Sequence, residues 1–177
     1  MKILKLAITG KMGTGKSSLT ALLKEQENAY VTSYSSVIRG VILGLDLQPS
    51  RDLMQATGDF FRKYNQDVWT DCLLKEVSTI SRTVIIEGIR YEFERDKLAS
   101  KGFKIIKVLS RDDLRRKRIE NREKIHLNDD VWVTWQNHPT EIYVDRIKAD
   151  YEIENNDSLD SLRHSVSKML VELKNTI

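Results

Sequence analysis

The sequence predicts an α/β fold in which helices alternate with the strands of a parallel β-sheet. Short apolar segments bounded by polar or turn residues are typical of buried strands. Segments with apolar residues at helical spacing lie between them. Strands that alternate with helices form βαβ units, which pair in parallel through right-handed crossovers. No repeat, low-complexity segment or linker divides the 177 residues, so we expect a single domain over residues 1–177.

The individual elements follow from the same periodicity. Strands are predicted at residues 3–9, 83–87, 103–109 and 151–154, with a weaker strand at 29–33. Helices are predicted at residues 16–27, 67–81, 111–124 and 158–173. Ser110 and Asp113 resemble a capping box for the third of these helices, and residues 156–158 are candidate caps for the last.

Composition excludes several classes of protein. The hydrophobic fraction is 40% and the charged fraction 31%, as in an ordinary globular protein. No apolar run approaches the roughly 18 residues that cross a bilayer, so we expect no membrane partner. The net charge of +3 is too small to predict nucleic-acid binding. The only cysteine, Cys72, excludes an internal disulfide; we expect a buried side chain there and a cytoplasmic protein.

Residues 10–17, GKMGTGKS, match the phosphate-binding pattern G-x-x-x-x-G-K-[ST] between a predicted strand and a predicted helix. Glycines let such a loop close around phosphate oxygens, and the helix N-terminus favours an anion. Lys16 supplies a charge for the β- and γ-phosphates, and the Ser17 hydroxyl suits Mg²⁺. The motif alone does not separate a kinase from a GTPase or a mechanical ATPase. The predicted nucleotide-binding residues are Gly13, Thr14, Gly15, Lys16, Ser17 and Ser18, with Ser17 as the metal ligand.

A carboxylate, Glu87, ends the strand predicted at residues 83–87. The carboxyl edge of an open α/β sheet is where ligands bind, so Glu87 is expected near the phosphates. There it would contact Mg²⁺ indirectly or contact the substrate. The alternative is a strand-end glutamate in solvent.

The helix predicted at residues 111–124 carries a row of arginines on one face, since Arg111, Arg115, Arg118 and Arg122 recur at helical spacing. Planar guanidinium groups recognise phosphate in a bidentate manner and stabilise the charge of phosphoryl transfer. We expect Arg118 and Arg122 to cover the transferring group. A solvated charged face is the alternative, and interleaved acidic residues argue against RNA binding.

An anionic acceptor requires further cations facing the loop. Arg39, Arg51 and Arg62 lie in a helical insertion before the strand at 83–87. Single arginines of this kind suit such a role, although each taken alone is more often a surface residue.

Taken together, these segments resemble the nucleoside monophosphate kinase group of P-loop kinases. The similarity is closest to the deoxynucleoside monophosphate kinases of phages. The dephospho-coenzyme A kinases, which share the closing segment, are the nearest alternative. The resemblance covers nearly the whole chain and rests on ITGKMGTGKSSL, ATGDFFRKYNQDVW, VIIEGIRYEFE, the arginines 115, 118 and 122, and ADYEIENNDSLDSL.

The resemblance implies a P-loop NTPase fold of three layers, with a five-stranded parallel sheet in the order 2-3-1-4-5 and helices on both sides. It implies ATP and Mg²⁺ as cofactors, a small phosphorylated acceptor, and a monomer or homodimer. Residues 33–81 would bind the acceptor, and residues 123–143 would form a lid that excludes water. The alternative for the latter segment is an ordinary long loop pinned to the core by tryptophans. Arg39, Arg62 and Arg90 would hold the acceptor phosphate.

One departure from the alternative family bears on the acceptor. A hydroxyl acceptor requires a carboxylate to take its proton, and dephospho-coenzyme A kinases have an aspartate near the end of the second strand. Residues 30–36, YVTSYSS, contain no acid there, which favours an already ionised phosphate acceptor, although Glu87 remains a possible base.

A kinase of a hydroxyl, such as dephospho-coenzyme A or a nucleoside, is the alternative enzyme. A nucleotide-dependent switch or binding module is the alternative outside enzymes; the absence of an N-K-x-D signature argues against a GTPase.

Overall fold

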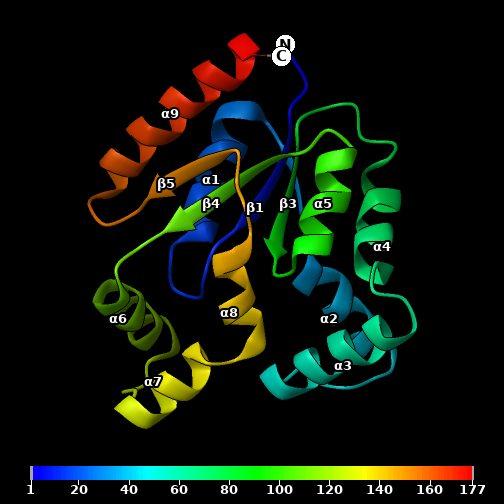
Figure 1. Ribbon diagram of the computed structural model, residues 1–177, viewed down its shortest axis with the longest axis vertical. Helices are drawn as coiled ribbons and strands as arrows, with labels where there is room; N and C mark the ends of the chain where they lie inside the picture. The colour runs from blue at the N-terminus through cyan, green and yellow to red at the C-terminus, as the bar shows by residue number, and fades with distance from the viewer. Residues whose placement is uncertain (1, 177) are drawn as a thin grey trace.

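A five-stranded, wholly parallel sheet forms the centre of the computed structural model, which describes residues 2–176 (Figure 1). The strand order is β2-β3-β1-β4-β5, as predicted. The three central strands, β1, β3 and β4, are apolar segments of the kind that a parallel sheet buries on both faces, whereas the edge strands β2 and β5 are only partly buried. The strands are β1 (Lys5–Thr9), β2 (Tyr30–Ser33), β3 (Val84–Ile89), β4 (Lys104–Leu109) and β5 (Tyr151–Glu154).

The alternation of side chains along β1 divides the core in two. Leu6 and Ile8 point to one face, where they join buried residues of α1 (Lys16–Glu27) and α9 (Leu159–Thr176). Ala7 points to the other face, in a cluster with residues of α2 (Tyr34–Gly44), α4 (Val68–Val77) and α5 (Glu92–Ser100). Figure 1 shows the resulting three layers, with α1 and α9 on one side of the sheet and α4 and α5 on the other.

Because all strand pairs are parallel, their carboxyl ends meet at a single edge. The phosphate-binding loop follows β1 at this edge, between the ends of β3 and β4. The register of the β1–β3 pair shifts between Ile8 and Thr9, beside the loop. The helices that lie beyond this edge in Figure 1 are α2, α3 (Arg51–Tyr64), α6 (Asp112–Glu123), α7 (Asp129–Gln136) and α8 (Pro139–Arg146).

The predicted helices are all present, with bounds that differ by a few residues at most. The helix α5 was not predicted, because its nine residues bury only Glu94 and Leu98 and therefore show little periodicity. Residues 33–81 contain α2, α3 and α4, and residues 123–143 contain α7 and most of α8 rather than an irregular loop.

Three local expectations have clear outcomes. The capping box at Ser110 is wrong: Arg111 is the N-cap of α6 without a side-chain cap, and the Ser110 hydroxyl donates to the Asn155 carbonyl instead. Ser158 does cap α9, since its Oγ accepts from the Ser161 N–H at 3.2 Å. Cys72 is exposed rather than buried, because on α4 it is the neighbouring Leu73 that faces the sheet.

No helix within residues 2–176 combines the length and the apolar character needed to cross a membrane.

Candidate active site

The loop after β1 closes so tightly that only glycine fits two of its positions. Gly13 and Gly15 have φ angles of +75° and +92°, in the region that side chains disfavour. A Cβ on Gly13 would lie 2.5 Å from the Arg115 carbonyl oxygen, and one on Gly15 would lie 2.1 Å from Asn155 Nδ2. Gly15 is also the N-cap of α1, with no side-chain cap. The first N–H groups of α1 therefore remain available to an anion held in the loop.

Lys16, at the start of α1, folds back over the loop. Its Nζ donates to the carbonyl oxygens of Gly10 at 2.7 Å and Lys11 at 2.8 Å. Burial, and then the nearby Arg90 charge, lower the Lys16 pKa to about 7. An anionic ligand beside Nζ would reverse this shift, because negative charge favours the protonated amine.

The loop and β3 present oxygen donors of the type that Mg²⁺ prefers. Ser17 is exposed on the first turn of α1. Glu87 does not end its strand as predicted, since β3 continues to Ile89, and it accepts a hydrogen bond from Thr20, one turn beyond Ser17 on α1. Ser18 is exposed, and the Thr14 hydroxyl donates to the Lys11 carbonyl at 2.9 Å. Within the described chain no group of three or more His, Cys, Asp or Glu is placed to hold a metal.

Arg90, immediately after β3, reaches the same loop. Its Nη1 lies 3.4 Å from the Gly10 carbonyl, which also accepts from Lys16. The same nitrogen forms an ion pair of 2.8 Å with Oε1 of Glu141, on α8. The second carboxylate oxygen of Glu141 accepts from the Met12 N–H at 2.7 Å. Two elements distant in sequence thus place charged side chains against the loop.

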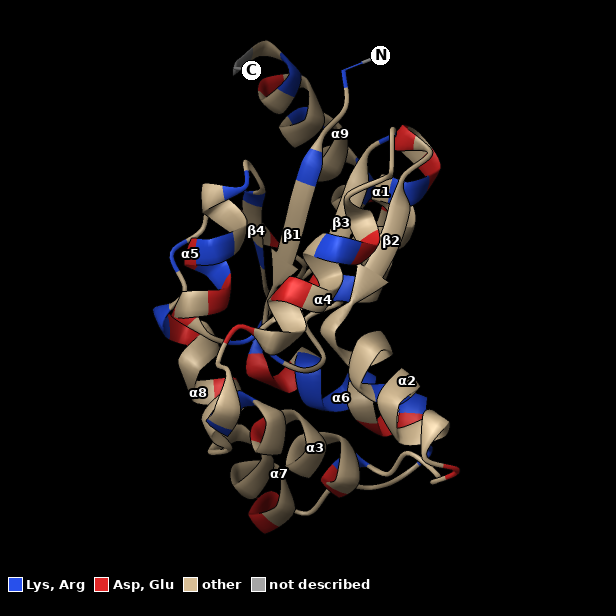
Figure 2. Cartoon of the chain, turned by 90° about the vertical axis from the view of Figure 1, so that its right-hand side faces the viewer, with Lys and Arg blue, Asp and Glu red and all other residues tan. Residues whose placement is uncertain are grey.

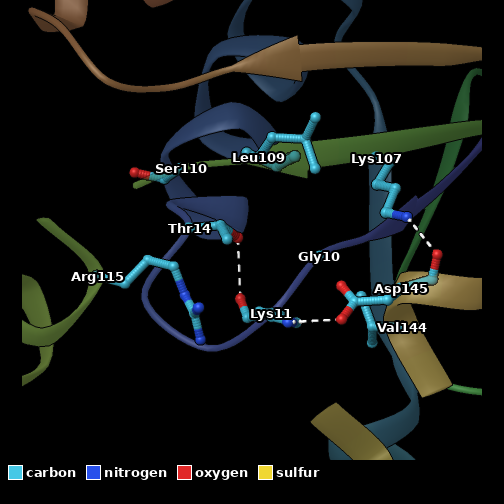
Figure 3. A pocket seen from close by; sticks show the side chains of 10 residues that line it. Gly10, Lys11, Thr14, Lys107, Leu109, Ser110, Arg115, Val144 and Asp145 are labelled. Carbon is cyan, nitrogen blue, oxygen red and sulfur yellow. Dashed lines mark hydrogen bonds and ion pairs between the residues drawn. The ribbon is translucent and has the colours of Figure 1, made fainter. Parts of the chain in front are cut away.

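Arg115 is the most deeply buried arginine of α6, with 4% of its surface exposed. Its Nε donates to the Met12 carbonyl at 2.9 Å, and its Nη1 donates to Asp112 and Gln136. It lines a cavity of about 150 Å³ between the loop, β4, α6 and α8, together with Lys11, Lys107 and Asp145 (Figure 3). Burial lowers the Arg115 pKa, and the Asp112 charge opposes this shift.

The two arginines predicted to cover the transferring phosphoryl group, Arg118 and Arg122, differ in their position relative to the loop. Arg118 packs against the loop from outside: its guanidinium is 2.9 Å from the Asn155 carbonyl, 3.0 Å from Ser110 Oγ and 3.4 Å from the Gly13 carbonyl. Arg122 is exposed and pairs with the adjacent Glu123 at 2.9 Å. Figure 2 shows basic and acidic residues together on α6. The structure therefore brings Arg115 and Arg118 to the loop, whereas Arg122 lies apart from it.

Of the three arginines predicted to bind the acceptor, Arg62 and Arg90 are linked through Glu94, whereas Arg39 is not part of this group. Arg62 pairs with Oε1 of the buried Glu94 at 2.9 Å, and Oε2 of Glu94 accepts from the Arg90 N–H at 2.9 Å. Glu94 thus joins Arg62 to Arg90. Burial raises the Glu94 pKa, although the Arg62 charge opposes that shift. Arg39 is exposed on α2 and has no ion pair with any residue in the described part of the chain.

Comparison with known protein families gives a match over most of the chain. A family model described as "AAA domain" matches residues 6–143. The chain belongs to this family. No curated protein matches it.

Solved structures with a similar fold include the TT1252 protein of Thermus thermophilus, with a TM-score of 0.68 and 19% identity over 98% of this chain and 99% of that one. The shikimate kinase of Aquifex aeolicus has a TM-score of 0.64 and 16% identity over 98% of both chains. A gluconokinase of Sinorhizobium meliloti has a TM-score of 0.60 and 10% identity over 98% of this chain and 97% of that one. At these identities the likeness shows the fold alone, and this AAA domain has a P-loop kinase-like fold.

Three residues that the sequence analysis did not single out also contact the loop of this AAA domain: Asn155, Glu141 and Arg115. Asn155 Nδ2 donates to the Thr14 carbonyl at 2.8 Å, so the end of β5 supports the loop. Its place after a strand, at the carboxyl edge of the sheet, is the signal that would have found it. Glu141 lies in a polar segment with little periodicity, and no sequence signal marks it as buried. Arg115 belongs to the predicted arginine row but was not preferred within it.

The segment 123–143 of this AAA domain contacts both the loop side and α3. The Trp132 Nε1–H donates to Asp112 at 3.0 Å, which fastens α7 to α6. The Arg51 guanidinium lies 4.3 Å from the Trp135 ring centroid, and Gln55 is 3.4 Å from His138 Nδ1. The tryptophans therefore join α7 to α6 on one side and to α3 on the other.

Proposed function

We propose that this protein transfers the γ-phosphoryl group of MgATP to a (deoxy)nucleoside monophosphate. The observation that carries the proposal is the convergence of cations on one loop. Lys16 and Arg90 meet at the Gly10 carbonyl, and Arg115 contacts the Met12 carbonyl. Phosphoryl transfer depends almost entirely on positioning and on neutralising charge around the phosphates, which is what such a group provides.

On the donor side, Lys16 and the N–H groups of residues 13–18 hold the phosphates. Ser17 would ligate Mg²⁺, and Glu87, which accepts from Thr20, would contribute negative charge near the ion. When bound, the ion neutralises charge on the phosphate oxygens. Arg118 and Arg122 keep their proposed role at the transferring group, and Arg115 is added to them because its guanidinium already lies at Met12. Arg122 reaches the phosphates only if the exposed end of α6 moves.

On the acceptor side, Arg90 and Arg62 form a connected pair through Glu94, and they orient the acceptor phosphate with Arg39. Because Arg90 also lies at the Gly10 carbonyl, its guanidinium faces the terminal phosphoryl group of the donor as well. Residues 33–81 bind the acceptor, and residues 123–143 act as the lid. The end of β2 presents the hydroxyls of Ser33, Ser35 and Ser36, hydrogen-bonded to one another and their backbone, with no carboxylate among them. This supports an acceptor that is already ionised and requires no base.

A hydroxyl acceptor is the second candidate, and one observation favours it. The carboxylates of Glu87 and Glu141 both lie beside the loop, and either is a potential proton acceptor. The structural neighbours named shikimate kinase and gluconokinase are kinases of this kind.

The choice of acceptor is tested by incubating the protein with MgATP and a panel of candidate acceptors while ADP release is followed. The panel contains nucleoside and deoxynucleoside monophosphates, nucleosides, dephospho-coenzyme A, shikimate and gluconate. We expect one or more monophosphates to raise ADP release at least 100-fold above the rate without acceptor, a modest part of the acceleration that enzymes achieve. Stimulation only by a hydroxyl compound would replace the proposal with the second candidate. The same slow release with every compound would contradict kinase activity.

The lowered Lys16 pKa predicts that MgATP binding takes up a proton above pH 7. The free protein holds Lys16 with a pKa of about 7, whereas phosphate charge raises it, so at pH 8 binding converts the amine to ammonium. Affinity should therefore fall as pH rises above 7, by at most about tenfold per pH unit.

Titration calorimetry at pH 8 in two buffers of different ionisation enthalpy measures this uptake. We expect close to one proton per nucleotide at pH 8 and much less at pH 6, where Lys16 is already charged. Identical heats in the two buffers at pH 8 would exclude the mechanism.

A further inference from the structure

The carboxylate of Glu141 occupies a position that an anion-binding loop normally offers to phosphate. The side chain comes from α8 and is 3% exposed. One oxygen accepts from the Met12 N–H at 2.7 Å, and the other pairs with Arg90 Nη1 at 2.8 Å. A main-chain N–H together with a guanidinium is the donor set that binds phosphoryl oxygens. Glu141 thus satisfies the Met12 N–H, which adjoins the N–H groups of residues 13–18, and the Arg90 guanidinium beside the loop.

The surroundings of Glu141 are cationic. Arg90 meets Lys16 at the Gly10 carbonyl, and Arg115 contacts the other side of Met12. Burial lowers the pKa of both Lys16 and Arg115, and the Glu141 charge opposes the shift at each. Glu141 therefore offsets positive charge on both Lys16 and Arg115, together with Glu87 at the first and Asp112 at the second.

The helix that carries Glu141 is held at the loop by further contacts. Lys11 forms an ion pair of 2.7 Å with Asp145, and the buried Lys107 donates to the carbonyls of Asp145 and Ile147 at 3.1 and 3.3 Å. Figure 3 shows Asp145 of α8 facing Lys11 and Lys107 across the cavity beside the loop. Because Glu141 is fixed on this helix, its carboxylate leaves the loop only when α8 shifts or its side chain turns away.

We infer that Glu141 is an internal competitor of phosphate, which occupies the place of the terminal phosphoryl group and is expelled when MgATP binds. This inference rests on the proposed nucleotide site. Two anions cannot share one N–H and one guanidinium at close range without strong repulsion, so binding and the Glu141 contact exclude each other. Glu141 holds Arg90 in alignment until the phosphoryl group replaces it. Glu141 also sets a threshold for binding, because a ligand must carry enough phosphoryl charge to displace a paired carboxylate. The release of α8 is coupled to this displacement.

The test is the variant Glu141→Gln, which keeps the size and hydrogen-bonding capacity of the side chain and removes its charge. Titration calorimetry should show MgATP binding about tenfold tighter than in the unsubstituted protein, equivalent to about 1.4 kcal/mol. Without nucleotide the Tm should fall, because Arg90 loses its partner. The rise in Tm on adding MgATP should be larger than in the unsubstituted protein, since the ligand restores the missing charge. A merely structural Glu141 would lower the Tm and leave the MgATP affinity unchanged.

Asp130→Asn is the matched control, because Asp130 is an exposed acid in the same segment and its replacement changes the net charge equally. Its MgATP affinity should stay within about twofold of the unsubstituted value, as expected for a screened surface charge. Equal gains in both variants would show a general charge effect and overturn the inference. If the unsubstituted protein binds MgATP and Glu141→Gln binds it equally well, the inference fails while the nucleotide site stands. If neither protein binds MgATP, the proposed function fails.

Hydrogen exchange of the unsubstituted protein gives an independent reading should Glu141→Gln not fold. We expect peptides that cover α8 to exchange faster when MgATP is added, as the helix is released, while peptides of the loop exchange more slowly. Unchanged or slower exchange in α8 together with protection of the loop would overturn the inference.

Discussion

Replacing Lys16 with alanine should lower the turnover of phosphoryl transfer by on the order of 10³-fold. The Nζ group is the charge that the loop carries closest to the proposed β- and γ-phosphates, and it already lies 2.7 Å from the Gly10 carbonyl. No other lysine of the loop replaces it, since Lys11 is paired with Asp145. Initial rates of ADP formation with the best acceptor measure the effect.

The stability of this variant should not fall. Burial lowers the Lys16 pKa from 10.5 to about 7, so between these values the folded state binds fewer protons than the unfolded state. Below pH 7 the folded protein holds a buried charged amine, which lowers its free energy of unfolding. That free energy rises as the pH increases from about 7 to 10.5. At pH 6 the variant Lys16→Ala should match or exceed the unsubstituted Tm. Lys24→Ala, at an exposed position near the end of the same helix, should retain full turnover; an active Lys16→Ala enzyme would refute the assigned site.

Replacing Gly13 with alanine should disrupt the phosphate-binding loop severely. The backbone there has φ +75°, and the new Cβ would lie 2.5 Å from the Arg115 carbonyl oxygen. Backbone atoms cannot turn aside as a side chain does, so the loop or α6 must shift. We expect a loss of about 2 kcal/mol in the free energy of unfolding, a Tm lower by about 6 °C, and loss of measurable MgATP binding. Thermal denaturation and calorimetry report the two effects separately.

Gly40→Ala is the matched control for the same substitution. A Cβ at Gly40 would meet no atom within 4 Å, and the residue lies inside α2. Alanine favours a helix over glycine, so this variant should gain about 0.5–1 kcal/mol and keep its MgATP affinity. A Gly13→Ala protein with the stability and affinity of the Gly40→Ala protein would show that the loop has no need of glycine.

The sheet was accessible from sequence because burial leaves a strong local signal. Along β1 the side chains of Leu6 and Ile8 enter one half of the core and Ala7 enters the other, and a strand buried on both faces is apolar throughout. The helix α5 was not accessible, since nine residues with a buried Glu94 carry little periodicity. The burial of Glu94 depends on Arg62, which lies 32 residues earlier in the chain.

By itself, the sequence determined the parallel α/β architecture, the phosphate-binding loop and the presence of enough arginines to serve it. These properties reside in short stretches, where periodicity and glycine spacing act through neighbouring residues. Only the tertiary structure decided which charges meet at the loop: Arg115 and Arg118 rather than Arg122, Asn155 beneath Thr14, and Glu141 on Met12. Such pairs join residues more than 100 positions apart, and a buried charge is stable only where folding brings it a partner.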